Sequence, residues 1–217
     1  MTVMGILWDM DGVLVDTGDF HFQAWSELLP EYGIEFSYEL HQETFGRNNA
    51  SILSLLFGEK LTPELLSEVS DRKEERFRAA VRGHAQPLPG VRTWLERLRS
   101  GEARQGIASS APVANIDTLT GELGLRGYFD AIVSGEAMPG KPDPTLFLEV
   151  ARRLDVTPER CVVVEDAIAG VEAAKRAGMK CIAVTTTNEA QALSAADIVV
   201  DRLDALPADA FRRLVAA

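Results

Sequence analysis

The sequence predicts an α/β fold in which helices cover both faces of a parallel sheet and a helical segment follows the first strand. Short apolar runs without polar alternation recur along the chain, which is typical of strands buried on both faces. Segments with helical apolar spacing separate most of these runs, an order that indicates parallel strands. One long interval near the N-terminus breaks this alternation because it shows helical periodicity alone.

The expected strands are short, and the first ends abruptly at Asp9-Met10-Asp11-Gly12. All are rich in apolar residues and are too short to be buried helices. They are Val3–Trp8, Gln105–Ala108, Ala131–Ser134, Cys161–Val164, Cys181–Val184 and Ile198–Val200.

The expected helices between the strands have apolar residues on one face. Asp143-Pro144 and Thr157-Pro158 each place a capping residue before a first-turn proline, and Gly178 is placed to end a helix. The predicted segments are Val91–Leu98, Ile116–Leu125, Leu146–Leu154 and Val171–Ala177.

The inserted interval is expected to be helical over Phe20–Tyr32, Ser51–Phe57 and Pro63–Arg82. We therefore predict two domains. Residues 1–16 and 84–217 form the α/β core, and residues 17–83 form the helical insertion.

The formal net charge of −11 argues against nucleic acid or an anionic membrane as a partner, because phosphate surfaces bind clustered Lys and Arg. No apolar stretch approaches the roughly 20 residues of a membrane span, and no export signal is recognisable. We expect a cytoplasmic protein that is a monomer.

Polar residues follow the predicted strands at the point where each strand ends. Ligands of parallel α/β sheets bind at this edge, so we expect these side chains to converge. A buried strand gains no stability from ending in acid, which favours a functional explanation. The residues are Asp9, Asp11, Ser109, Ser110, Ser134, Glu165 and Asp166, with Lys141 just beyond the third strand.

Converging carboxylates repel one another unless a cation neutralises them, and a hard all-oxygen site is typical of Mg²⁺. Beside such a cation, Asp9 can act as a nucleophile toward phosphorus. Asp11 is placed to protonate the leaving oxygen and then to deprotonate water. Ser109 and Lys141 can bind the phosphoryl oxygens. The predicted chemistry is phosphoryl transfer.

Four motifs strengthen this prediction: Asp-Met-Asp-Gly-Val-Leu-Val-Asp at 9–16, Ala-Ser-Ser at 108–110, Gly-Lys-Pro-Asp-Pro at 140–144 and Val-Glu-Asp-Ala-Ile-Ala-Gly at 164–170. Together they resemble the haloacid dehalogenase superfamily, in particular its β-phosphoglucomutase-like branch, which includes sugar-phosphate phosphatases. The resemblance covers essentially the whole chain. It implies a Rossmann-like parallel sheet core with an inserted helical cap domain.

The resemblance also implies roles for individual residues. Asp9 is the nucleophile and Asp11 the acid–base, while Ser109 and Lys141 bind the phosphoryl group. The implied Mg²⁺ ligands are Asp9, the backbone carbonyl of Asp11, Asp166 and Glu165. The carboxylate at Asp11 favours phosphate esters over the substrates of dehalogenases and phosphonatases.

Further residues of the predicted cap are candidates for substrate binding. Thr17, His21 and Trp25 share one helical face; the resemblance implies function for the first two, and Trp25 is expected to pack. By itself Lys73 is typical of a solvated helix face, but it aligns with a mutase lysine that reaches the site. The remaining candidates are Gly46, Arg47 and Asn49 in the cap loop, and Ser110.

Three functions remain open. A phosphatase of a small phosphorylated metabolite, in particular a sugar phosphate, is favoured. A phosphohexomutase is the alternative, but mutases of this branch carry an arginine at the place of Asn49 and a Lys-Asn pair at that of Pro112-Val113. A non-catalytic binding domain would have no physical reason to keep clustered like charges.

Overall fold

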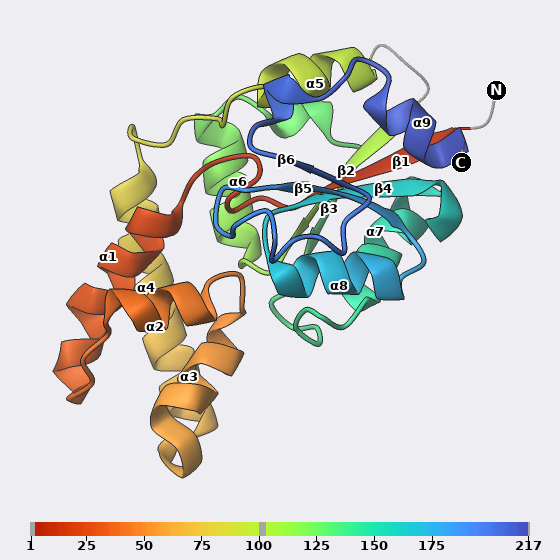
Figure 1. The fold of residues 1–217 in the computed structure, drawn as a ribbon. Helices are drawn as coiled ribbons and strands as arrows, with labels where there is room; N and C mark the ends of the chain where they lie inside the picture. The colour runs from red at the N-terminus through yellow and green to blue at the C-terminus, as the bar shows by residue number, and fades with distance from the viewer. Residues whose placement is uncertain (1–2, 100–102, 217) are drawn as a thin grey trace.

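The computed structural model describes residues 3–99 and 103–216. Within them one parallel sheet of six strands is formed in the order β3-β2-β1-β4-β5-β6, which confirms the predicted α/β fold (Figure 1). Each predicted run forms a strand. The strands are β1 (Met4–Trp8), β2 (Ala103–Ser109), β3 (Ala131–Ser134), β4 (Cys161–Glu165), β5 (Lys180–Val184) and β6 (Ile198–Val200).

Strand β1 is central and buried at every residue. Trp8 lies opposite Ile107 of β2 on one side and opposite Val164 of β4 on the other. The strand order therefore reverses at β1, and the crevice beyond such a switch point is where open α/β sheets bind ligands. The residues that follow Trp8 enter this crevice.

Helices cover both faces of the sheet. Figure 1 shows α5 and α9 over one face and α7 and α8 over the other. No helix within the described residues is long and apolar enough to cross a membrane. The α-helices are α1 (Gly18–Leu28), α2 (Tyr38–Thr44), α3 (Asn49–Phe57), α4 (Pro63–Val81), α5 (Val91–Arg99), α6 (Val113–Glu122), α7 (Thr145–Leu154), α8 (Ile168–Arg176) and α9 (Ala210–Ala216).

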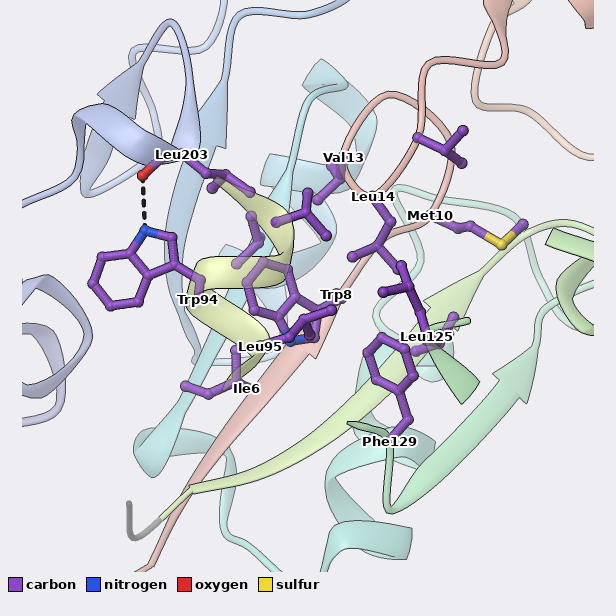
Figure 2. Packing of buried hydrophobic residues seen from close by; sticks show 14 of the residues in the cluster. Ile6, Trp8, Met10, Val13, Leu14, Trp94, Leu95, Leu125, Phe129 and Leu203 are labelled. Atoms are coloured by element: carbon purple, nitrogen blue, oxygen red, sulfur yellow. Dashed lines mark hydrogen bonds between the residues drawn. The ribbon is translucent and has the colours of Figure 1, made fainter. Parts of the chain in front are cut away.

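The side chains on the two faces of β1 belong to two different hydrophobic clusters. Ile6 and Trp8 pack with Trp94 and Leu95 of α5 (Figure 2). The Trp94 indole Nε1 donates a hydrogen bond to the Leu203 carbonyl at 2.8 Å, so its polar atom is satisfied inside the cluster. Leu7, pointing the other way, packs in the second cluster with residues of α7 and α8. This double burial explains why β1 shows no polar alternation.

The helices α1–α4, here named the cap helices, lie to one side of the sheet in Figure 1. They have a hydrophobic cluster of their own, which includes Trp25, Phe36 and Leu53. Residues 17–83 are all described and contain no strand, as the sequence predicts. Val15 forms a bridge with Pro87, so the outgoing and returning chain segments lie side by side. The two-domain boundaries stay a prediction.

Candidate active site

The Asp9 carboxylate lies at the end of β1, where it meets Lys141. The Asp9 N–H donates to the Val164 carbonyl at 3.0 Å, which holds this residue beside β4 after the strand has ended. Lys141 Nζ donates to Asp9 Oδ1 and to Glu165 Oε1, both at 2.5 Å. All three side chains are nearly buried. One ammonium therefore bridges two buried carboxylates from neighbouring strands.

Burial dominates the electrostatics of these carboxylates. It raises the pKa of Asp9 to about 7, against the attraction of Lys141 and with further repulsion from Glu165 and Asp11. Burial and the charges of Glu165 and Asp9 also raise the pKa of Asp166 well above its usual range. Conversely, Asp9 and Glu165 overcome the burial of Lys141 and raise its pKa. The site thus carries more buried negative charge than one lysine neutralises.

Glu165 and Asp166 point to different partners. Glu165 Oε2 accepts hydrogen bonds from the N–H groups of Asp166 and Ala167, both at 2.8 Å, while Oε1 accepts from Lys141. Asp166 Oδ2 accepts from the Thr187 hydroxyl. Gly12 lies against Asp166: its φ is +80°, and a Cβ there would collide with the Asp166 carboxylate.

The donor set fits Mg²⁺. No group of three or more His, Cys, Asp or Glu side chains within residues 3–99 and 103–216 is arranged to hold a metal ion. Mg²⁺ is commonly bound by one or two carboxylates together with waters and substrate phosphate. Asp9 and Asp166, buried at neighbouring strand ends with raised pKa values, match that pattern. Both oxygens of Glu165 are already engaged, so its direct ligation stays a prediction.

Asp11 faces the cap helices. Its Oδ1 accepts a hydrogen bond from the Thr17 hydroxyl at 2.5 Å and lies 3.4 Å from His21 Nε2. Burial opposes ionisation of Asp11, but the hydrogen bonds from His21 and Thr17, with the charge of Lys73, outweigh it and lower its pKa. The residue proposed as acid–base is therefore held by two side chains that the sequence placed on one helical face.

Lys73 fixes the state of this histidine. Its ammonium lies 2.7 Å from His21 Nδ1, and since lysine can only donate, Nδ1 accepts and Nε2 is left to donate to Asp11. The imidazole stacks on Phe77 with ring centroids 4.0 Å apart. Lys73 also pairs with Glu74 at 2.8 Å and is only 2% exposed. The structure thus places Lys73 inside the site and not on a solvated face.

Two serines, Ser109 as the last residue of β2 and Ser110 directly after it, lie on the β2 side of the crevice. Ser109 is buried, and its Oγ accepts a hydrogen bond from the Ala111 N–H at 3.1 Å, which leaves its hydroxyl proton free to donate elsewhere. Ser110 borders the open space in front of α6. This loop lies where N–H groups at a helix start can bind an anion.

A cavity of about 320 Å³ lies between the cap helices and the sheet edge. Asp9, Asp11 and Ser110 line it from the sheet, whereas Gly46 and Arg47 line it from the loop between α2 and α3. A Cβ on Gly46 would lie 3.5 Å from the Ala167 Cβ, so this loop runs close to the strand β4 side of the crevice.

The structure brings all the predicted site residues around this cavity or its floor. Those that line it are Asp9, Asp11, His21, Gly46, Arg47, Asn49, Lys73 and Ser110. Thr17, Ser109, Lys141, Glu165 and Asp166 are buried or half-buried behind these groups. Trp25 packs in the cap cluster as expected and also reaches the cavity wall.

Two groups of residues were missed by the sequence analysis. Glu74 of α4 and Asn115 of α6 are buried and joined by a hydrogen bond of 2.5 Å from Asn115 Nδ2 to Glu74 Oε2. Thr187 and Asn188 bind the Asp166 carboxylate and carbonyl, respectively. Nothing in their local sequence signals these contacts, because each depends on how separate elements pack.

Comparison with known proteins agrees with the geometry. A family model described as haloacid dehalogenase-like hydrolase matches residues 6–184. A phosphorylated carbohydrates phosphatase of Thermotoga maritima is 34% identical over 197 residues, which cover 89% of this chain and 91% of the relative.

A β-phosphoglucomutase of Bacillus subtilis is 32% identical over 203 residues, which cover 90% of this chain and 88% of the relative. The crystal structure of a β-phosphoglucomutase from Clostridium difficile superimposes with a TM-score of 0.89 at 25% identity. That superposition covers 99% of this chain and 98% of the other, so the cap helices and the sheet are both included.

Proposed function

Because this chain belongs to the haloacid dehalogenase-like hydrolases, we propose that it is a Mg²⁺-dependent phosphatase of a small phosphorylated metabolite of the sugar-phosphate class. The observation that carries the proposal is the buried Asp9–Lys141 pair at the end of the central strand, with Asp11 beside it and the cavity in front. The relative from Thermotoga maritima, named as a phosphatase of phosphorylated carbohydrates, supports the substrate class.

In the proposed reaction, Asp9 attacks the phosphorus and the bond from phosphorus to the ester oxygen breaks. Asp11 gives its proton to the departing oxygen. Asp11 then takes a proton from water, which attacks the phosphorus of the aspartyl-phosphate and releases phosphate and free Asp9. A bound Mg²⁺ would neutralise phosphoryl charge at Asp9 and Asp166.

The contacts of Asp11 suit both steps. Thr17 and His21 lower its pKa, which favours the carboxylate that must accept a proton from water. A phosphoryl group adds negative charge beside Asp11, which favours the protonated acid needed in the first step. Lys141 holds Asp9 in place and offsets the charge that the phosphoryl oxygens bring to the site.

The cap is proposed to close over the substrate. Residues 17–83 join the sheet through two adjacent segments, at Val15 and Pro87, a geometry suited to a hinge. His21 of the cap touches Asp11, so the acid–base is complete only with the cap helices in place. In this scheme the domains are residues 1–16 with 84–217, and residues 17–83.

The alternative is a phosphohexomutase, which the relative from Bacillus subtilis supports. Both activities use Asp9 in the same way and differ in whether water or a sugar hydroxyl takes the phosphoryl group. The family assignment favours either enzyme over a non-catalytic binding domain.

A phosphate-release screen over sugar phosphates with Mg²⁺ tests the proposal, run beside the isomerisation of β-glucose 1-phosphate with a bisphosphate primer. We expect release to exceed isomerisation, and we expect Asp9→Asn to abolish release while the circular dichroism spectrum is unchanged. Isomerisation that outpaces release by about tenfold, a gap of about 1.4 kcal/mol in barrier height, would favour the mutase. An active Asp9→Asn chain would exclude the covalent mechanism.

A further inference from the structure

We propose that Glu74 is a specificity-determining residue that restricts the cavity to phosphate esters whose far end is uncharged and hydroxylated. This inference rests on the phosphatase proposed above and deepens it. It separates monophosphate esters from bisphosphates and phosphorylated acids, which the chemistry at Asp9 alone cannot distinguish.

Glu74 is a buried carboxylate between the cap helices and the sheet domain. It lies on α4, is 4% exposed, and uses both oxygens. Oε1 accepts hydrogen bonds from Asn49 Nδ2 and Lys73 Nζ, both at 2.8 Å, and Oε2 accepts from Asn115 Nδ2 at 2.5 Å. One side chain therefore orders the cap loop, the cavity lysine and the start of α6 together.

Glu74 also offsets the positive charge of Lys73 that a ligand would otherwise meet. The Lys73 ammonium donates to Glu74 and to His21, and it lies over the rings of Trp25 and Phe77 at 5.3 and 5.2 Å. Its charge is thus balanced inside the protein before a substrate arrives. The charge of an ammonium paired in this way is already offset, so it attracts a second phosphate less than an unpaired ammonium would.

The rest of the cavity wall supplies little positive charge. Apart from Lys73, the one Lys or Arg among the described lining residues is Arg47, in the loop before α3. Asp71 and Glu136 line the same cavity as Glu74. A second phosphate would therefore face one arginine and three carboxylates, and in a partly buried site such repulsion is weakly screened.

The pKa of Glu136 shows the effect of this negative charge. Burial raises the pKa of Glu136, and the charges of Glu74 and Asp71 raise it further. These carboxylates therefore act on one another across the space between α4 and the loop that follows β3. The same potential would act on an anionic group of a ligand.

The remaining wall offers neutral hydrogen-bonding groups beside apolar surface. Asn48, Ser67 and Ser70 contribute amide and hydroxyl groups, while Ile52 and Leu66 contribute apolar contacts. Such a surface suits the hydroxyls and carbon skeleton of an uncharged polyol or sugar. The geometry thus assigns the single phosphate to Asp9 and the neutral remainder to the cap side.

The test compares the affinities of glucose 6-phosphate and glucose 1,6-bisphosphate by calorimetry with Mg²⁺ present, in the Asp9→Asn background, where no turnover is expected. We expect the monophosphate to bind more tightly. Adding Glu74→Gln keeps the shape of the side chain but removes the negative charge that offsets Lys73. This change should shift the affinity ratio toward the bisphosphate by about tenfold, the usual effect of one charged contact.

Glu75→Gln is the matched control, because it makes the same charge change on the same helix at an exposed position; it should leave the ratio unchanged. Glu136→Gln, on the exposed loop, should shift the ratio in the same direction as Glu74→Gln and serves if the buried variant does not fold. An unchanged ratio in the folded variants, a bisphosphate preferred by the parent, or failure of both esters to bind would overturn the inference. Because calorimetry needs no turnover, absence of phosphate release from the natural chain would instead count against the proposed phosphatase.

Discussion

Replacing Lys141 with Met should destabilise the protein strongly and in a pH-dependent way. Lys141 is 5% exposed and lies between Asp9 and Glu165, whose side chains are 10% and 1% exposed. Removing one partner of a buried ion pair costs about 3–5 kcal/mol because a buried charge is left uncompensated. The variant leaves two buried carboxylates without their lysine, and the protein can recover part of the lost stability by taking up a proton.

The free energy of proton uptake determines how much stability the variant loses at each pH. A carboxyl with an ordinary pKa near 4 is protonated at a cost of about 1.4 kcal/mol for each pH unit above that value. At about pH 5 this route limits the loss to about 1–2 kcal/mol for one group, whereas at about pH 8 the full 3–5 kcal/mol is expected. Burial already raises the pKa of Asp9 to about 7 with Lys141 in place, and loss of the lysine raises it further. Stability is therefore retained below the unfolded pKa and lost as the pH rises toward the folded pKa of Asp9.

Urea unfolding followed by circular dichroism at these two pH values measures the effect. Lys175→Met is the matched control: Lys175 is a half-exposed lysine that pairs with Asp197 at 2.7 Å, and its loss should cost under about 1 kcal/mol at either pH. A Lys141→Met loss as small as that of the control, or one that does not grow with pH, would refute the reasoning.

Mg²⁺ at about 100 times its Kd should raise the melting temperature by about 5–10 °C in a thermal scan, EDTA should reverse the rise, and Asp166→Asn should remove most of it. Burial lowers the pKa of His41 to about 4; because the unfolded chain protonates first, the free energy of unfolding should fall by up to about 3 kcal/mol between about pH 6.5 and pH 4 in urea titrations, and less so in His41→Phe. An equal dependence of the free energy of unfolding on pH in the two proteins would contradict this. Gly170→Ala should destabilise and slow phosphate release, since its Cβ would collide with the Glu165 carboxylate, whereas Gly121→Ala, in a helix with open space, should stabilise by about 0.5–1 kcal/mol. Similar melting shifts for both alanine variants would contradict it.

The sequence predicted the sheet and its functional edge because both follow from local patterns. Each strand is an unbroken apolar run, and parallel topology places all the strand ends on one edge, so Asp9 and Asp166 had to be neighbours. Two short helices, α2 and α9, were not predicted. Each has seven residues, too few for helical periodicity to stand out from a loop.

The cap side of the site was less predictable because it depends on tertiary packing. Lys73 and Glu74 belong to a charged run on a helix, a pattern typical of solvent exposure, yet both are buried where α4 meets α1 and α6. Asn115 gave no signal at all. The burial of a charged side chain can be predicted from sequence only when the partner that neutralises it is known.

The position of β1 has a consequence for the order in which the chain is made. Among the strands of the sheet β1 is synthesised first, yet it lies between β2 and β4, which begin at Ala103 and Cys161. At synthesis rates of about 5–20 residues per second, a central strand waits about 8–30 s for its second neighbour. During that time the cap helices can pack around their own cluster. Any truncated product that ends before β4 exposes an apolar, unpaired strand edge, so incomplete chains are the species that chaperones and proteases must remove.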